Sequence, residues 1–292
     1  MQTTTKKRTL MMFNPAAGKG KGPRDEAHYT TKEKGDGRRF IKEECEKAPD
    51  THFIVCGGDG TLNEAVCGIM DAGAGHMASL TAHPCGSGTD TVKSFPTDKK
   101  GETVKLDVIK LNDRYGINMI NIGFDCNVVS SAAMFKHKWK LAGKISYILG
   151  VIREFFRPIG ENYKIDAVLE DGSSFSYHGP TLLCAICNGQ WCGGSFHNSP
   201  YSDMRDGVLE LVLVKKTGRI NFIKMIGRYQ NGTLIGEQGK ITPEAYSTIV
   251  SCHRIRSVTV TGMKRVCTDG EVEEMSSAAI TVLPQAIQYT YG

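Results

Sequence analysis

The chain has 292 residues, of which 40% are hydrophobic and 23% are charged, and its formal net charge is +5. This composition is typical of a folded globular protein and excludes a largely disordered one. The charge is too small to indicate a nucleic-acid-binding protein by itself. No stretch reaches the ~20 apolar residues that a transmembrane helix requires, and the apolar stretch 10–13 is too short for a secretory signal. We therefore expect a cytoplasmic protein with one large domain or two smaller ones.

The N-terminal third alternates between strand-like and helix-like patterns. Strands are predicted at Leu10–Phe13, Phe53–Cys56 and Ala78–Ala82, and helices at Arg38–Lys47 and Leu62–Met70. This alternation indicates a mostly parallel sheet with helices on its faces. Each strand is followed by a polar or glycine-rich segment, namely NPAAGKGKG, GGDGT and PCGSGTD. Because ligands of open α/β sheets bind outside the carboxyl ends of the strands, these three loops predict one binding site.

The segment GGDGT carries the strongest local signal. Thr61 and Glu64 form a capping-box pattern, which predicts that the following helix begins at Thr61. A glycine turn before a helix gathers backbone N–H groups around an anion, and the helix dipole favours negative charge there. Asp59 then suggests a cation beside the phosphates, since Mg²⁺ is commonly held by one or two carboxylates and phosphate oxygens. The alternatives are an ordinary connection and an aspartate that only favours a turn. Neither the P-loop spacing nor G-x-G-x-x-G occurs.

Beyond residue 105 the sequence becomes rich in strands and hairpins. Leu106–Leu111 and Ile117–Phe124 are predicted to flank one hairpin turn, and Lys164–Leu169 and Ser173–Tyr177 another, with the Asp-Gly pair of the second turn suited to a tight hairpin. Further strands are predicted at GVLELVLV, SVTVTG and AAITVLP, with helical stretches around 131–157 and 219–235.

Two domains follow from this change of pattern. We predict an α/β nucleotide-binding domain over residues 1–105 and an antiparallel β-sandwich over residues 106–292, whose last strands could return to the first domain.

Ten cysteines are scattered along the chain, mostly within apolar runs. Cys184 and Cys187 have the spacing of half a zinc site, but no second pair follows, and a strand would place them on opposite faces. Buried free thiols are therefore favoured over a metal site or disulfides.

Six elements occur in a characteristic order: NPAAGKG (14–20), GGDGTLNE (57–64), GSGTD (86–90), Asp107, DMRDGVLE (203–210) and TDGE (268–271). Together they resemble the diacylglycerol kinase catalytic family, specifically the soluble bacterial lipid kinases of the diacylglycerol and sphingosine kinase type. The resemblance covers nearly the full length. It implies an NAD kinase/diacylglycerol kinase-like fold, with the active site between an ATP-binding domain and a β-sandwich.

The resemblance also implies roles for single residues. Glu271 matches the general base, and Asp107 matches the acidic residue that orients the same site. Asp203, Asp206 and Val208 match a structural Mg²⁺ site. The positions that match nucleotide contacts are Asn14, Pro15, Ala16, Ala17, Gly18, Thr31, Gly58, Asp59, Gly60, Thr61, Leu62, Asn63, Glu64 and Ser87. A carboxylate near the acceptor hydroxyl, with ATP and Mg²⁺, is what phosphoryl transfer to an alcohol requires.

The resemblance implies an ATP- and Mg²⁺-dependent lipid kinase acting on diacylglycerol or a related lipid alcohol, with a place in phospholipid metabolism. An NAD kinase-like soluble kinase and a catalytically weak nucleotide-binding regulator are the alternatives. The regulator is kept open because the run 89–93, Thr-Asp-Thr-Val-Lys, departs from the family pattern of Asn-Asp, an aromatic residue, a small residue and Arg. Arg205 also stands where an acidic residue is usual. Without the resemblance, Glu271 would be interpreted as a solvated hairpin carboxylate.

Residues 134–157 carry six basic residues and one acidic residue among apolar and aromatic ones. This pattern is typical of a helix that lies on an anionic membrane surface, although a helix packed on the sandwich would show a similar stripe. We expect a lipid alcohol at the membrane surface as the partner and no nucleic acid. Peripheral contact with the inner membrane face and a homodimer are both compatible with the resemblance.

Overall fold

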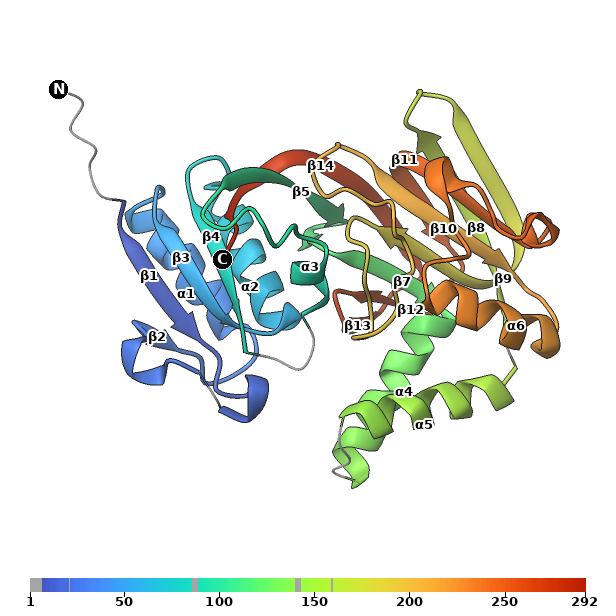
Figure 1. The fold of residues 1–292 in the computed structure, drawn as a ribbon, viewed down its shortest axis with the longest axis horizontal. Coiled ribbons are helices and arrows are strands. Elements are labelled where there is room, and N and C mark those ends of the chain that lie inside the picture. Colours follow the sequence, from blue (N-terminus) through green and yellow to red (C-terminus); the bar gives the residue numbers. More distant parts are fainter. Residues whose placement is uncertain (1–6, 21, 86–88, 140–142, 159) are drawn as a thin grey trace.

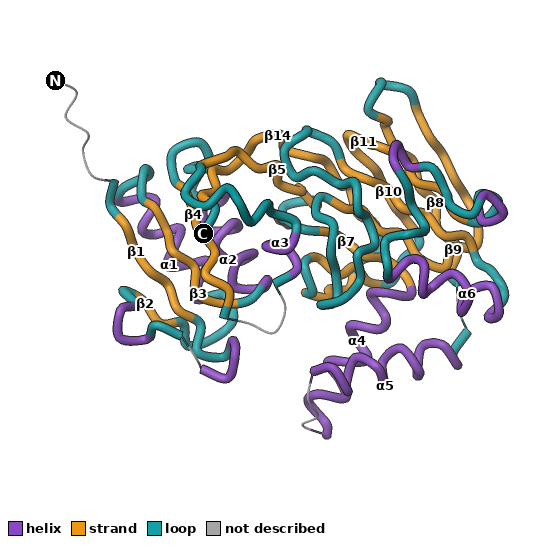
Figure 2. Tube along the Cα trace, in the orientation of Figure 1, coloured by secondary structure: helices purple, strands orange, loops and turns teal. Residues whose placement is uncertain are grey.

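The computed structural model describes residues 7–20, 22–85, 89–139, 143–158 and 160–292. Figure 1 shows an α/β region built from the N-terminal part of the chain and a larger, strand-rich region beside it. Figure 2 shows that helices gather in the α/β region and below the sandwich, whereas strands dominate the rest.

The α/β region contains a parallel sheet with the strand order β2-β1-β3-β4. Its elements are β1 (Thr9–Phe13), β2 (Tyr29–Thr30), α1 (Asp36–Lys47), β3 (His52–Gly57), α2 (Asp59–Asp71), β4 (Ser79–Pro84) and the short α3 (Asp90–Lys93). The predicted parallel sheet and its flanking helices are confirmed.

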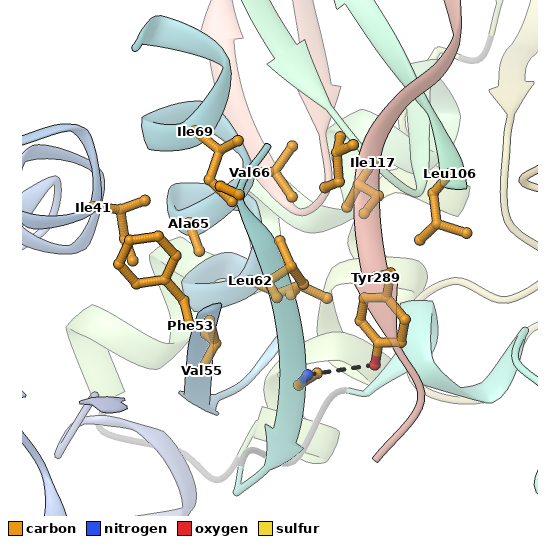
Figure 3. Packing of buried hydrophobic residues seen from close by; sticks show 14 of the residues in the cluster. Ile41, Phe53, Val55, Leu62, Ala65, Val66, Ile69, Leu106, Ile117 and Tyr289 are labelled. Atoms are coloured by element: carbon orange, nitrogen blue, oxygen red, sulfur yellow. Dashed lines mark hydrogen bonds between the residues drawn. The ribbon is translucent and has the colours of Figure 1, made fainter. Parts of the chain in front are cut away.

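The core of this region forms where α1 and α2 pack on the sheet. Phe53 and Val55 of β3 share one buried cluster with Ile41 of α1 and with Leu62 and Ile69 of α2, as Figure 3 shows. The apolar residues of α2 recur every three or four positions, so they form a single face toward the sheet. Full burial of each such side chain contributes about 1.5–3 kcal/mol.

The strands of the second region pair antiparallel with one another. They are β5 (Thr103–Leu111), β6 (Arg114–Gly116), β7 (Met119–Gly123), β8 (Glu161–Leu169), β9 (Ser174–Cys187), β10 (Leu209–Lys215), β11 (Val250–Thr261), β12 (Arg265–Thr268), β13 (Glu271–Glu274) and β14 (Ser277–Thr290). Cys184 and Cys187 of β9 belong to different core clusters, so they face opposite sides of the sheet, as predicted. All ten cysteines are free thiols.

One predicted hairpin is wrong. β5 turns through Asn112, whose φ is +49°, and pairs with β6, while β7 pairs with β9 and β12 instead. The chain leaves β5 because the carboxylate of Asp269 accepts the backbone N–H groups of residues 117, 118 and 119. The second predicted hairpin, β8–β9, is confirmed, and Gly172 in its turn has a φ of +86°.

The helical stretch predicted around 131–157 is two packed helices, α4 (Phe124–Trp139) and α5 (Gly143–Phe156). They approach closely at Gly150, where a Cβ would lie 2.8 Å from the carbonyl oxygen of Val128. Figure 1 shows the pair below the sandwich, near α6 (Arg219–Gln230). In the described part of the chain, no helix is long and apolar enough to cross a bilayer.

β14 connects the two regions. It pairs antiparallel with β5 and β11, bends at a bulge between Leu283 and Ile287, and then runs parallel to β4. Gln285 within the bulge has a φ of +50°. The C-terminal end of the chain therefore lies in the α/β sheet, where Tyr289 and Tyr291 pack against Phe95.

Candidate active site

The loops that follow β1, β3 and β4 meet at one edge of the parallel sheet. The N–H of Asn14 donates to the Cys56 carbonyl (2.9 Å), and the N–H of Cys85 donates to the Gly57 carbonyl (3.0 Å). Gly18 has a φ of +58°, and a Cβ there would lie 1.7 Å from the Cys85 carbonyl oxygen. Only glycine fits at this contact between the first and third loops.

Asn14 links the first loop to α2. Its amide Nδ2 donates to the Thr61 hydroxyl (2.8 Å), and its Oδ1 accepts the N–H of Ala16 (2.9 Å). Pro15 follows Asn14 in the same turn, and Ala17 begins a short 3-10 helix, Ala17–Gly20.

Most of the GGDGT segment already belongs to the helix α2 and does not form a separate turn before it. Gly58 is the N-cap, with extended backbone angles, and α2 begins at Asp59, two residues before the predicted start. The predicted capping box is absent, because the Thr61 hydroxyl binds Asn14 and the carboxylate of Glu64 is used elsewhere. The N–H groups of residues 61 and 62 donate to the Gly58 carbonyl. Those of Asp59 and Gly60 have no intrahelical acceptor, which is the condition for anion binding at a helix N-terminus.

Glu64 positions the segment before α1. Its carboxylate accepts the N–H groups of Gly35 (2.9 Å) and Gly37 (3.0 Å). Gly35 is the N-cap of α1, in the left-handed region at φ +86°. Thr31, buried just before this segment, donates its N–H to the Phe13 carbonyl. Glu64 and Thr31 therefore shape the edge of the site.

Asp59 caps α3 across the site. Its two carboxylate oxygens accept the N–H groups of Asp90 and Thr91, both at 3.0 Å. Asp90 in turn accepts from the Lys93 ammonium (2.8 Å) and from the N–H of Gly194 (2.8 Å). The unusual run 89–93 is thus a folded helical turn held by Asp59. A carboxylate has about four lone-pair positions, so Asp59 keeps about two for a cation.

Glu271 lies beside the first turn of α2. Its Oε1 is 4.0 Å from the place where a Cβ on Gly60 would lie, and its Oε2 forms an ion pair with Lys34. The Glu271 side chain is about half exposed, at 45%. A carboxylate and an ammonium group therefore flank the exposed N–H groups of α2.

The hairpin that carries Glu271 is fixed by Asp269, a residue that was not predicted to belong to the site. Asp269 accepts four donors: the N–H groups of Ile117 (2.7 Å), Asn118 (3.0 Å) and Met119 (2.8 Å), and the Asn63 amide (2.8 Å). Burial raises the pKa of this carboxyl, while the four donors lower it. Asp269 and Gly270 both have positive φ, at +48° and +92°. The Asp-Gly pair in TDGE was the sequence signal that indicated a turn at this position.

Asp107 lies at the centre of β5 and is fully buried. Its carboxylate accepts the N–H groups of Gly207 (2.7 Å) and Gln285 (2.7 Å), so it holds the β14 bulge and the loop before β10 together. Burial raises its pKa, and so do the nearby charges of Asp206 and Asp203. The described contacts connect Asp107 to this loop and not to Glu271.

The loop 203–208, matched to a structural Mg²⁺ site, is held by arginines. Asp206 accepts from the Arg254 guanidinium (2.8 Å) and from the N–H of Val208 (3.2 Å), and Asp203 forms a bidentate pair with Arg205 (2.8 and 2.9 Å). No group of three or more His, Cys, Asp or Glu side chains in the described ranges could hold a metal ion. The guanidinium of Arg254 supplies a positive charge at the Asp206 carboxylate, and the Mg²⁺ site implied by the resemblance stays a prediction.

Ser87 lies outside the described residues. Asp125, at the start of α4, has its pKa raised to about 6 by burial and lies 3.4 Å from the Tyr229 hydroxyl. The sequence signal for Asp125 was an acidic residue two positions after the end of the apolar strand β7.

Comparisons with known proteins match both halves of the chain. Residues 118–290 match the family described as YegS C-terminal NAD kinase beta sandwich-like domain, and residues 8–122 match the diacylglycerol kinase catalytic domain. Two relatives, from Yersinia enterocolitica and Serratia proteamaculans, are each named "Probable lipid kinase YegS-like". They are 31% identical over 195 residues, which is 63% of this chain and 63% and 61% of their own lengths. The chain thus matches less than two thirds of these relatives.

A crystal structure titled as a diacylglycerol kinase from Bacillus anthracis has the same fold. It is 24% identical, with a TM-score of 0.70, and the match covers 99% of this chain and 98% of that one. At this identity the match supports the fold and not the activity.

Proposed function

The chain belongs to the family that carries the YegS C-terminal NAD kinase beta sandwich-like domain, and we propose that it is a lipid kinase. It would transfer the γ-phosphate of ATP to the hydroxyl of diacylglycerol or a related lipid alcohol. The names of the relatives and the diacylglycerol kinase catalytic domain support this activity. The observation that carries the proposal is the position of the Glu271 carboxylate beside Gly60, at the N-terminus of α2.

The phosphates of ATP would lie against the first turn of α2. The N–H groups of Asp59 and Gly60 would donate to phosphate oxygens, and the positive end of the helix dipole would favour their charge. Lys34 stands on the same side, paired with Glu271. Mg²⁺ brought with the nucleotide would neutralise charge on the transferred phosphoryl group. Asp59, with about two unused lone-pair positions, is the residue suited to hold it.

Glu271 would act as the general base. As the lipid hydroxyl oxygen bonds to the γ-phosphorus, the bond from that phosphorus to the β–γ bridging oxygen breaks and ADP leaves. The hydroxyl proton passes to a Glu271 carboxylate oxygen. Asn14 and Glu64 would keep the first loop and the segment before α1 in place around the nucleotide. Asp269 would hold the Glu271 hairpin against α2 and β7.

The test is transfer of labelled γ-phosphate from ATP and Mg²⁺ to diacylglycerol, a sphingoid base, phosphatidylglycerol and, as a soluble acceptor, NAD. We expect label in a lipid, and a loss of ~10²–10⁴-fold in kcat for Glu271→Gln. Glu274→Gln is the matched control, because Glu274 is an exposed carboxylate of the same short strand. Label in NAD alone would overturn the proposal in favour of an NAD kinase. ATP binding without transfer to any acceptor would favour a regulator.

A further inference from the structure

An exposed apolar stripe runs along α5. Ile145, Ile148, Ile152 and Phe156 have exposed fractions between 48 and 74%. Their spacing of three, four and four residues places them on one narrow face of the helix. The opposite face is the one that meets α4, through the close approach at Gly150. The stripe therefore has no role in the packing of these two helices.

α6 carries two more exposed isoleucines beside the end of α5. Ile220 and Ile223, in its first turns, are 71% and 57% exposed. Arg219 donates to the carbonyls of Phe155 (3.1 Å) and Arg157 (3.3 Å), so the start of α6 is joined to the end of α5. We call the six side chains at 145, 148, 152, 156, 220 and 223 the α5–α6 face. Of ten exposed large apolar side chains in the described ranges, six are here, and such a concentration marks an interaction surface.

The surroundings of this face are basic. Glu154, an acidic residue of α5, is buried, accepts the Ser131 hydroxyl (2.6 Å), and lies 3.8 and 3.7 Å from Arg153 and Arg157. Its charge is therefore largely compensated. Exposed basic residues on the neighbouring surface of α4 and α6 are Lys136, Lys138, Arg219, Lys224 and Arg228. An apolar face within a positive field complements an anionic bilayer.

We propose that the α5–α6 face docks on an anionic lipid bilayer, with its isoleucines and Phe156 in the interfacial layer and the lysines and arginines against lipid headgroups. At 14 residues, α5 is too short to span a bilayer, so it would lie in the plane of the surface. A second copy of the chain is a poorer occupant, because a symmetric contact would place like charges opposite one another. The inference deepens the proposed function and rests on it for the identity of the lipid acceptor.

The experiment is sedimentation with vesicles of phosphatidylcholine and phosphatidylglycerol, without nucleotide, so that binding is measured apart from phosphate transfer. Ile148→Ser/Ile152→Ser/Phe156→Ser should lower the partition coefficient at least tenfold. Lys136→Glu/Lys138→Glu should lower it by about fivefold or more per residue, since each basic residue contributes about 1 kcal/mol near an anionic surface. The matched control, Met77→Ser/Val168→Ser, removes exposed apolar side chains elsewhere and should bind as the unchanged protein does. Each variant should still unfold cooperatively, because no replaced side chain is buried, so a loss of binding does not report a loss of the fold.

Equal binding by the triple serine variant, or no binding by the unchanged protein, would overturn the docking proposal. So would a dimer in light scattering that the triple variant abolishes, since the face would then belong to a second copy. Phosphate transfer from ATP to a short-chain diacylglycerol in free solution separates the docking proposal from the kinase proposal. Transfer without vesicle binding would refute docking alone, and vesicle binding without transfer would refute the kinase alone.

Discussion

Replacing Asp269 by Asn should destabilise the protein by about 3–6 kcal/mol. The substitution keeps the side-chain shape and tolerates the positive φ of +48° at this position. In the structure, one oxygen accepts Ile117 N–H and the Asn63 amide, and the other accepts the N–H groups of Asn118 and Met119. An asparagine oxygen can keep one such pair, while its NH₂ group faces the other two donors. Each lost hydrogen bond to a charged acceptor costs about 1.5–3 kcal/mol, and two are lost.

The assay is urea unfolding at neutral pH, compared with Asp171→Asn. Asp171 is also the aspartate of an Asp-Gly hairpin turn, but it is exposed and its carboxylate accepts from the N–H and hydroxyl of Ser173. That control should change the unfolding free energy by no more than about 0.5 kcal/mol. A change below about 1 kcal/mol for Asp269→Asn, with an unaltered m-value, would refute the view that Asp269 fixes the Glu271 hairpin.

Three further outcomes follow from the structure. Burial raises the pKa of Asp125 to about 6, so the folded state binds this proton more tightly than the unfolded chain. Stability should therefore fall by up to ~3 kcal/mol as pH rises from about 4 to 6, and Asp125→Asn should flatten that slope in thermal scans. Asp107→Ala should cost about 2–4 kcal/mol, because two partly buried N–H groups lose a charged acceptor; equal melting temperatures would contradict this. Without nucleotide, 10 mM Mg²⁺ should not change the melting temperature. Arg254→Gln should lower the melting temperature by several degrees. A saturable stabilisation by Mg²⁺ that Asp206→Asn abolishes would instead show a metal site in the loop 203–208.

Three strands and two helices of the α/β region, β1, β3, β4, α1 and α2, follow from local patterns, which is why they were predictable, whereas the short β2 and α3 were not predicted. The start of α2 was not predictable, because it depends on partners far along the chain. Thr61 and Glu64 fit a capping box by spacing, yet their side chains bind the first loop and the N-terminus of α1. Asp59 likewise serves a helix that begins at Asp90. Sequence spacing identifies residues that could cap a helix, but tertiary contacts decide which helix they cap.

In the second half of the chain, too, local patterns could not predict structure that depends on distant contacts. The hairpin predicted between β5 and β7 failed because the pairing of β7 depends on β9, β12 and the carboxylate of Asp269. Asp269 is a single polar residue whose four donors come from α2 and from the segment 117–119, so no periodicity could reveal it. The placement of Glu271 next to Gly60 likewise required the fold, although the motif that contains Glu271 was visible in the sequence.

The most direct test of the central claim compares the unchanged protein, Glu271→Gln and Glu274→Gln for transfer of labelled phosphate from ATP to diacylglycerol. The position of Glu271 beside the N-terminus of α2 predicts label in the lipid for the unchanged protein and for Glu274→Gln. It predicts a loss of ~10²–10⁴-fold for Glu271→Gln at an unchanged melting temperature. Transfer by Glu271→Gln within about threefold of the unchanged protein, or no transfer to any lipid by the unchanged protein, would contradict the account.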